Sequence, residues 1–248
     1  MSQVQPIRPA ATVIIVRDAE QDFEIFMLKR TSAAAFAGGM YVFPGGRVDG
    51  EDHLHKYDER RVGPSEQQAA QRHALGPEWR GYWVAGIRES FEEAGLLLAY
   101  TPDGELLAYE DDAAQARFDA YRGPLHAGEL TLGAICEREN LKLAVDHIHF
   151  YNRFVTPLGR PRRFDTRFFI AAAPPGQTGR HDDKETVDSI WISPRDALRR
   201  NDKKQFDLMR VTRLQLEDLA RSRSKAEVLD AAAASTEFPT FRPQLPGA

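Results

Sequence analysis

Residues 88–96, with the sequence RESFEEAGL, place three glutamates within little more than one turn of a predicted helix that ends at Gly95. Residues three and four apart are neighbours on a helix, so Glu89, Glu92 and Glu93 share one side. Three like charges this close repel one another, and we expect Arg88 or a divalent cation to compensate them. Oxygen-rich sites of this kind suit Mg²⁺ or Mn²⁺. The alternative is a solvated acidic face.

A second motif, FPGGRVDGED, covers residues 43–52. Its proline followed by two glycines predicts a tight turn in which the backbone approaches another group closely. Together the two motifs resemble the Nudix box, the signature of the Nudix hydrolases. The residues that match it are Gly46, Arg88, Glu89, Glu92, Glu93, Gly95 and Leu96.

The sequence departs from the box in three ways. Asp52 stands where the family usually has glutamate, and Ser90 where an apolar residue is usual. Thirty-five residues separate Asp52 from Arg88, instead of the usual seven, so the box carries an insertion of about 28 residues. The resemblance therefore rests on a split box.

Hydrophobic periodicity predicts strands and helices in mixed order, which is typical of an α/β class. We expect strands at 11–17, 23–30, 147–155, 163–172 and 186–192, and helices at 66–74, 83–94, 113–122, 128–138, from Pro194, and across 203–233. The resemblance implies the Nudix fold, an α/β/α sandwich around a mixed sheet. It also implies one domain over 1–248, with insertions at about 51–80 and 101–140 and a helical extension from about 203.

Composition narrows the class of protein. A net charge of −4 and a pI near 6.0 argue against a general nucleic-acid surface. No run approaches the ~18 apolar residues of a membrane span, and residues 1–9 lack the apolar stretch of a secretory signal. Cys136 is the only cysteine, which excludes an intrachain disulfide and fits a reducing compartment; we expect it to be a core residue. We expect a cytoplasmic protein.

The resemblance implies metal-dependent hydrolysis of a diphosphate bond in a nucleoside diphosphate linked to another moiety. Metal ions neutralise phosphate charge and lower the pKa of bound water. Glu92 and Glu93 would be the principal Mg²⁺ or Mn²⁺ ligands. Glu89 would be a third ligand or the general base, and the carbonyl of Gly46 an additional ligand.

The other site residues follow from the same resemblance. Asp52 would orient Arg88, which we expect to organise the site, and Gly45 and Gly95 would support it structurally. Some family members take their base from a distant loop, so Glu185, in the acidic segment HDDKE at 181–185, is a second candidate base. The alternative for that segment is a solvated turn.

The substrate class follows from a partial match before the box. Residues 28–46 resemble the extra motif of coenzyme A diphosphatases, with Thr31 in place of serine and Ala35 in place of arginine. The whole pattern resembles the nucleoside-diphosphate-linked moiety 19 branch, whose animal members act on acyl-CoA in peroxisomes. Residues 245–248, LPGA, are not a peroxisomal address, so we expect a bacterial cytoplasmic relative.

The expected partner is therefore a small-molecule nucleotide, CoA or acyl-CoA, contacted by Arg30, Arg47 and Arg163, because arginine suits phosphate. ADP-ribose or NADH is the alternative substrate, since the box does not separate these from CoA. An alternative of another class is a non-catalytic Nudix domain that senses a ligand. A homodimer is possible, and neither nucleic acid nor membrane is expected as a partner.

Overall fold

The computed structural model describes residues 5–34 and 36–244. Ala35 and residues 245–248, to which sequence arguments were attached, lie outside this part. The strands are β1 (Ile7–Asp18), β2 (Phe23–Arg30), β3 (Tyr41–Val42), β4 (Gly45–Arg47), β5 (Arg61–Val62), β6 (Ala99–Tyr100), β7 (Lys142–Ala144), β8 (Ile148–Val155), β9 (Arg163–Ala172), β10 (Thr186–Ile192) and β11 (Thr240–Phe241). The α-helices are α1 (Ala69–Leu75), α2 (Trp79–Ala94), α3 (Asp112–His126), α4 (Leu132–Arg138), α5 (Pro194–Asp202), α6 (Arg210–Leu219) and α7 (Lys225–Ala234).

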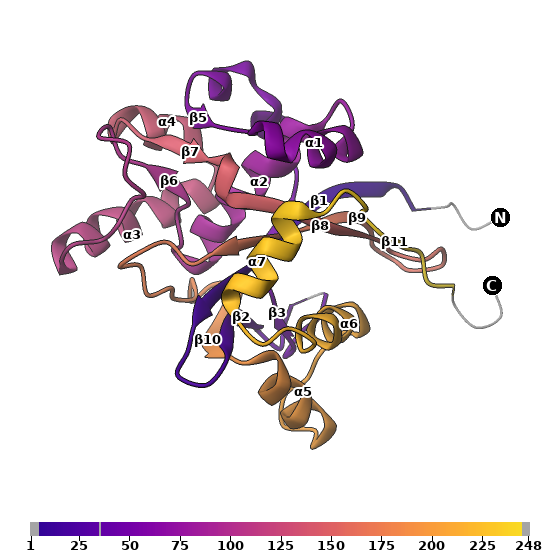
Figure 1. Cartoon of the computed structure of the whole chain (residues 1–248). Coiled ribbons are helices and arrows are strands. Elements are labelled where there is room, and N and C mark those ends of the chain that lie inside the picture. The colour runs from indigo at the N-terminus through magenta and orange to yellow at the C-terminus, as the bar shows by residue number, and fades with distance from the viewer. Residues whose placement is uncertain (1–4, 35, 245–248) are drawn as a thin grey trace.

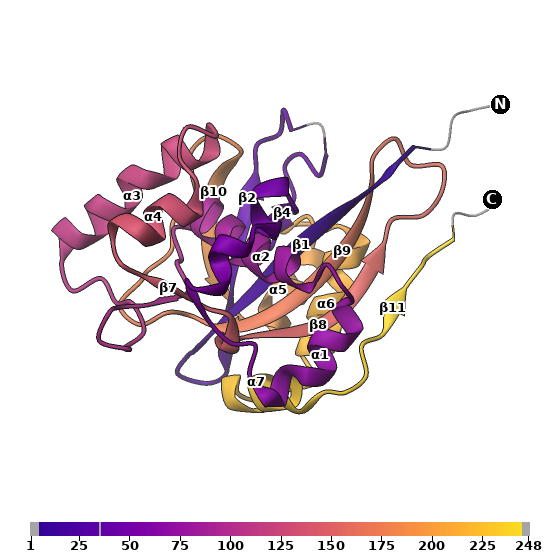
Figure 2. The same ribbon diagram turned by 90° about the horizontal axis from the view of Figure 1, so that it is seen from above.

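The main sheet is mixed, as Figures 1 and 2 show, with the order β10-β2-β1-β9-β8-β11. The central strands β1 and β9 run parallel over a long register from Ile7↔Arg163 to Val16↔Ala172. Strands β2 and β10 add antiparallel on one side, and β8 adds antiparallel on the other. The short strands β3 and β4 pair with β2 and β1, so they add backbone beside the middle of the sheet.

Each face of this sheet is buried against its own set of helices. Successive residues of a strand point to opposite faces, and β1 divides accordingly. Val13 and Ile15 belong to one hydrophobic core with α2, α3 and α4, whereas Ile14 and Val16 belong to a second core with α5, α6 and α7. The result is the predicted α/β/α sandwich around a mixed sheet (Figure 1).

The segment between the two box motifs folds onto the start of α2. It contains two 3-10 helices, Gly50–His53 and His55–Asp58, and then β5 and α1. The Asp58 carboxylate accepts hydrogen bonds from Nε and Nη2 of Arg80, each at 2.9 Å, which ties the segment to the first turn of α2. Strand β5 joins β7 and β6 in a separate three-stranded sheet.

Most predicted elements are confirmed, including β2, β9 and β10 at their predicted bounds and Gly95 as the helix stop, with φ 69°. Cys136 is buried in the core, as expected. The continuous helical stretch predicted for 203–233 is wrong, because residues 203–209 are not helical and the stretch forms α6 and α7 separately. The small sheet was not predicted, and α2 begins four residues before the predicted start.

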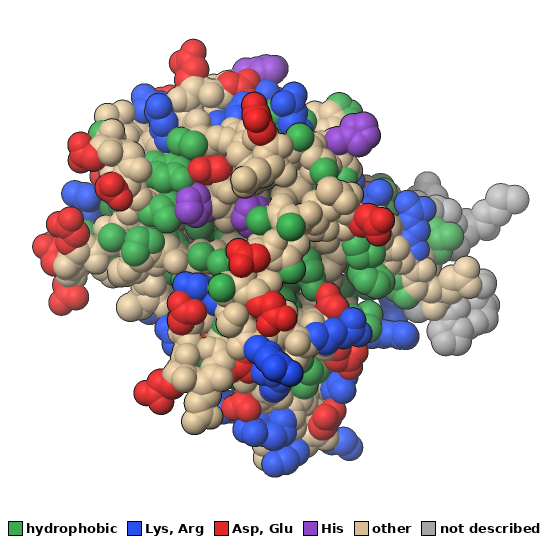
Figure 3. Space-filling model, viewed as in Figure 1, with side chains coloured by type: hydrophobic (Ala, Val, Ile, Leu, Met, Phe, Trp, Pro, Cys, Tyr) green, Lys and Arg blue, Asp and Glu red, His purple; other side chains and the backbone are tan. Residues whose placement is uncertain are grey.

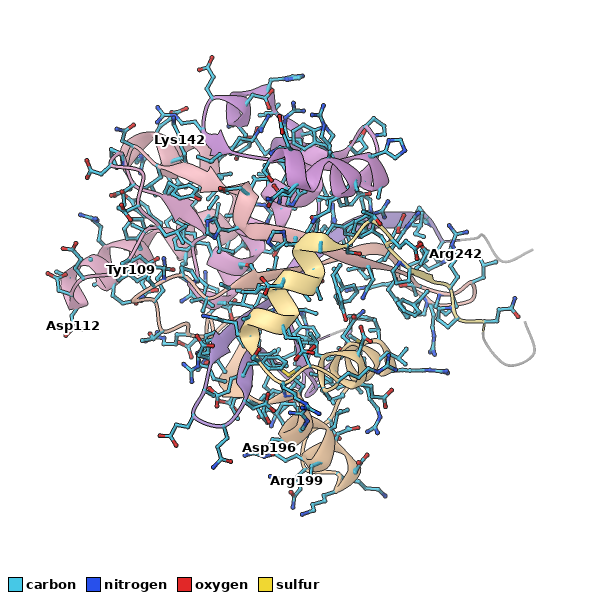
Figure 4. All side chains as sticks on the ribbon, in the orientation of Figure 1. Tyr109, Asp112, Lys142, Asp196, Arg199 and Arg242 are labelled. Atoms are coloured by element: carbon cyan, nitrogen blue, oxygen red, sulfur yellow. The ribbon has the colours of Figure 1, made fainter. Side chains whose placement is uncertain are left out.

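The surface is uneven in charge. Lysine and arginine side chains gather over the part of the molecule that contains α5, at the bottom of Figure 3. Figure 4 places Asp196 and Arg199 of α5 there, at the opposite end of the molecule from Lys142 of the small sheet. Within residues 5–34 and 36–244, no helix is both long and apolar enough to cross a membrane.

Candidate active site

The last turns of α2 carry the candidate residues on one side and core residues on the other. Trp83, Ile87 and Phe91 are fully buried in the hydrophobic core. Glu89 and Glu93 are also largely buried, at 8% and 6% exposure, but they face the backbone of β4. The helix therefore presents these two carboxylates inward to protein, rather than to bulk water as the solvated-face alternative required.

Arg88 is the centre of a buried network of ionic contacts. Its Nε and Nη2 donate to the two carboxylate oxygens of Asp52, at 2.9 and 3.0 Å, and Asp52 is completely buried. Its Nη1 donates to Glu89 Oε1 at 2.9 Å and lies 3.3 Å from Glu92 Oε2. Its Nη2 also donates to the carbonyl of Arg47 at 2.8 Å. One guanidinium thus joins the two halves of the split box, and the expected Arg88–Asp52 pair is present.

The two glycines bring β4 against the carboxylates. The amide N–H of Gly45 donates to Glu93 Oε2 at 2.9 Å. A Cβ atom added to Gly46 would lie 2.4 Å from Glu89 Oε1, so only glycine leaves room for that carboxylate. The prediction of a tight turn at this motif is wrong, because Gly45–Arg47 is a short strand paired with β1. The close approach of backbone that it predicted is confirmed.

Burial sets the ionisation of these groups. Burial raises the pKa of Glu89 to about 8, with Arg88 opposing the shift and the negative charge of Glu92 adding to it. Burial and then the charge of Glu89 raise the pKa of Glu93 well above its ordinary value. Burial disfavours the charge of Arg88, but its hydrogen bond with Asp52 and the charge of Glu89 outweigh this, and its pKa is raised. Glu89 is therefore paired with Arg88, whereas the polar partner of the Glu93 carboxylate is the neutral Gly45 amide.

The loop at 181–185 reaches the same place. Glu185 Oε2 accepts a hydrogen bond from Arg30 Nη2 at 2.9 Å, and the Glu185 carbonyl accepts one from the amide of Thr31. The charges of Arg30 and Glu185 both act on Glu93, Arg30 lowering and Glu185 raising its pKa, after the larger effects of burial, Glu89 and the Gly45 N–H. Asp182 holds the loop in shape by accepting hydrogen bonds from its backbone amides, those of residues 184–186. The loop is therefore ordered around its own aspartate, and the structure places Glu185 beside Arg30.

The other two candidate arginines lie differently. The side chain of Arg47 is about half exposed, 56%, and 3.8 Å from Asp49, so only its backbone carbonyl joins the network. Arg163 lies at the outer end of β9, where it donates to the carbonyls of Thr156 and Gln5. The structure does not bring Arg163 together with the residues on α2.

Sequence reasoning missed two residues of α3, in the segment to which no chemistry was assigned. The buried guanidinium of Arg122 donates to the carbonyls of Glu92 (3.1 Å), Glu93 (2.9 Å) and Arg180 (2.8 Å), and thus caps the end of α2. Nδ1 of His126 lies 2.9 Å from Glu92 Oε1. The only signal in the sequence was their spacing of four residues, which puts both on one face of a helix.

The donor set fits a hard divalent cation. Carboxylate and carbonyl oxygens are the ligands that Mg²⁺ and Mn²⁺ prefer, and Glu89, Glu92, Glu93 and the Gly46 carbonyl supply this type. In the described part of the chain, no three His, Cys, Asp or Glu side chains are already grouped as a metal centre. The carboxylates instead bond to Arg88, to the Gly45 amide and to His126, so ion binding would exchange some of these contacts.

Comparison with known families gives a match over residues 59–221 to the family model described as the NUDT19 Nudix domain. The matched region includes α2 with its glutamates but begins after the glycine motif of β4. A crystal structure of a Nudix hydrolase from Alicyclobacillus acidocaldarius superposes with a TM-score of 0.72 and 25% identity, covering 93% of this chain and 99% of that one.

Curated relatives carry related names. The acyl-coenzyme A diphosphatase NUDT19 of Gallus gallus is 26% identical over 217 residues, which cover 72% of this chain and 56% of the relative. The protein of the same name from Xenopus laevis is 23% identical over 206 residues, covering 71% and 54%. The putative nudix hydrolase 7 of Caenorhabditis elegans is 28% identical over 200 residues, covering 77% and 53%. The chain thus spans about half the length of these relatives.

Proposed function

The chain belongs to the Nudix family of the NUDT19 type, and from this we propose that it hydrolyses the diphosphate bond of CoA or an acyl-CoA. The products would be 3′,5′-ADP and phosphopantetheine or its acyl derivative. The observation that carries the proposal is the convergence of Glu89 and Glu93 against β4 with Glu92 and the Arg88–Asp52 pair beside them. The names of the relatives support the choice of substrate. We take residues 1–248 as one Nudix domain with insertions at 51–80 and 101–140.

The cofactor in this proposal is Mg²⁺ or Mn²⁺, held by Glu92 and Glu93 with Glu89 and the Gly46 carbonyl as further donors. Such an ion would offset the repulsion between buried carboxylates and supply Lewis-acid charge and an activated water. The fixed parts of the site come from the chain itself. Arg88 holds the side chains of Glu89 and Glu92 in place, and the carboxylate of Asp52 fixes the orientation of Arg88.

Arg30 is the candidate that we retain for the substrate phosphates. Its Nη2 is paired with Glu185, whereas its Nε is buried without a hydrogen-bond partner among the described residues. An unpaired buried donor is costly unless a ligand satisfies it, so this N–H supports a phosphate contact. Arg47 is a second proposed contact, since its side chain is about half exposed and its ion pair with Asp49 is long, at 3.8 Å. The general base would be Glu89, which lies on α2, or Glu185, which lies in the loop before β10.

The proposal is tested by chromatographic product analysis. The purified protein with Mg²⁺ or Mn²⁺ is given CoA, acyl-CoA, ADP-ribose, NADH and deoxynucleoside triphosphates. We expect 3′,5′-ADP from CoA, near-complete loss of turnover in Glu92→Gln, and no change in Glu20→Gln, a matched substitution in the exposed hairpin after β1. Turnover of ADP-ribose or NADH alone would keep the chemistry and change the substrate. Absence of turnover on the whole panel would favour the ligand-sensing module.

A further inference from the structure

His126 contacts the one glutamate of the α2 cluster that is not locked against β4. Its Nδ1 lies 2.9 Å from Glu92 Oε1, while Glu92 Oε2 lies 3.3 Å from Nη1 of Arg88. The two oxygens of this carboxylate are therefore held by side chains from different parts of the chain. Arg88 lies on the same helix as Glu92, whereas His126 belongs to the 101–140 segment.

The position of His126 is fixed by the packing of α3. Arg122, one turn earlier on the same helix, is hydrogen-bonded through its buried guanidinium to the carbonyls of Glu92 and Glu93. Phe118, one turn earlier again, is buried in an edge-to-face contact with Phe91 of α2. Three successive turns of α3 thus face the end of α2. The His126 contact follows from this docking and is not an isolated surface pair.

Glu92 and His126 also line the same hollow. It has a volume of about 130 Å³, and its wall includes Arg180, His181 and Lys184 from the loop before β10. A cavity needs only about 10–15 Å³ of such volume to hold one water, so the hollow is large enough to admit solvent. Glu92 is therefore the glutamate of the cluster that borders open space, where the orientation of a carboxylate is set by its hydrogen bonds.

We propose that His126 is a positioning residue that orients the Glu92 carboxylate for metal binding. The inference rests on the proposed function in one respect, the assignment of Glu92 as a ligand. Carboxylates that bind metals are themselves held by hydrogen bonds, and loss of such a partner typically costs about 10–100-fold in metal affinity or activity.

The test is the affinity for Mn²⁺, measured on the purified protein by titration with detection of the free ion by electron paramagnetic resonance. His126→Ala should weaken Mn²⁺ binding by about 10-fold or more. His126→Asn should restore most of it, because the Asn amide nitrogen occupies nearly the position of Nδ1. His73→Ala, which removes an exposed histidine of α1, is the matched control and should bind as the parent does. Turnover of CoA should follow affinity, with kcat falling more than KM rises.

Two results would overturn the proposal. Mn²⁺ affinity in folded His126→Ala that equals or exceeds that of the parent would show that the histidine does not position the ligand. Equal losses in His126→Ala and His126→Asn would show that the hydrogen bond is not the cause. If the parent hydrolyses no substrate while Mn²⁺ binding still depends on His126, the positioning role stands and the proposed function fails.

Discussion

Removal of the charge from Asp52 is the most direct test of the network around Arg88. Asp52→Asn keeps the shape of the side chain, and its amide oxygen can still accept from the Asp49 amide, which donates to Asp52 Oδ2 at 2.8 Å. What is lost is the two-point contact with Arg88, a residue that is only 9% exposed. Breaking one side of a buried pair costs about 3–5 kcal/mol, because the other charge stays buried. Since Arg88 keeps its contact with Glu89, we expect about 3 kcal/mol.

The assay is urea unfolding at pH 7, which gives the free energy of unfolding, and a second experiment measures the melting temperature. For a chain of this size, 3 kcal/mol corresponds to a decrease of roughly 6–12 °C. Asp103→Asn, in the exposed loop after β6, is the control and should change the free energy of unfolding by less than about 0.5 kcal/mol. A loss below about 1 kcal/mol in Asp52→Asn, with an unchanged m-value, would refute the claim that this pair carries the buried charge of Arg88.

Three further changes test other parts of the structure. Gly46→Ala should reduce turnover about 10²-fold, because its Cβ would displace the Glu89 carboxylate, whereas Gly50→Ala, with no atom within 4 Å of its Cβ, should leave turnover unchanged. Arg122→Ala should cost about 3 kcal/mol in urea unfolding, since one buried and two part-buried hydrogen bonds from a charged donor to carbonyls are lost; a loss under 1 kcal/mol would contradict the cap. Burial opposes the ionisation of Asp165, but hydrogen bonds from its two arginine partners lower its pKa. The stability that ionised Asp165 contributes is therefore fully present above the ordinary pKa of ~3.9, and it is lost as the pH falls through the lower pKa of the folded state. The difference in melting temperature between the parent and Asp165→Asn should consequently shrink below about pH 4.

The local sequence pattern was sufficient to predict the strands of the main sheet that are covered on both faces. The run from Val13 to Val16 is β-branched and apolar at every position because both faces are covered, and it was predicted as a buried strand. The small sheet has strands of two or three residues that come from distant parts of the chain, and no periodicity can develop over that length. The apolar residues of the small sheet belong to the hydrophobic core, and their pattern did not indicate a second sheet.

The same limit applies to the site. The residues on α2 were found because they lie in one short motif, and their chemistry is visible in their spacing. Arg122 and His126 are joined to that motif only by the docking of α3, which the sequence does not encode locally. Their helix is rich in alanine and charge and is typical of a solvated surface helix. A pattern in sequence therefore predicts which groups could act, and the tertiary packing decides which others surround them.

The long interval inside the box is tolerated for a simple energetic reason. Thirty-five residues lie between Asp52 and Arg88, about five times the usual seven. Each doubling of a flexible loop costs only about 0.6 kcal/mol in closure entropy, so the longer interval costs roughly 1.4 kcal/mol. Breaking one side of the buried pair that closes the interval would cost more than this, about 3–5 kcal/mol, because the other charge would stay buried. Moreover, the segment is folded on α2 through Asp58 and Arg80, which offsets part of the cost. The contact between the two halves, rather than their distance in sequence, is what this site requires.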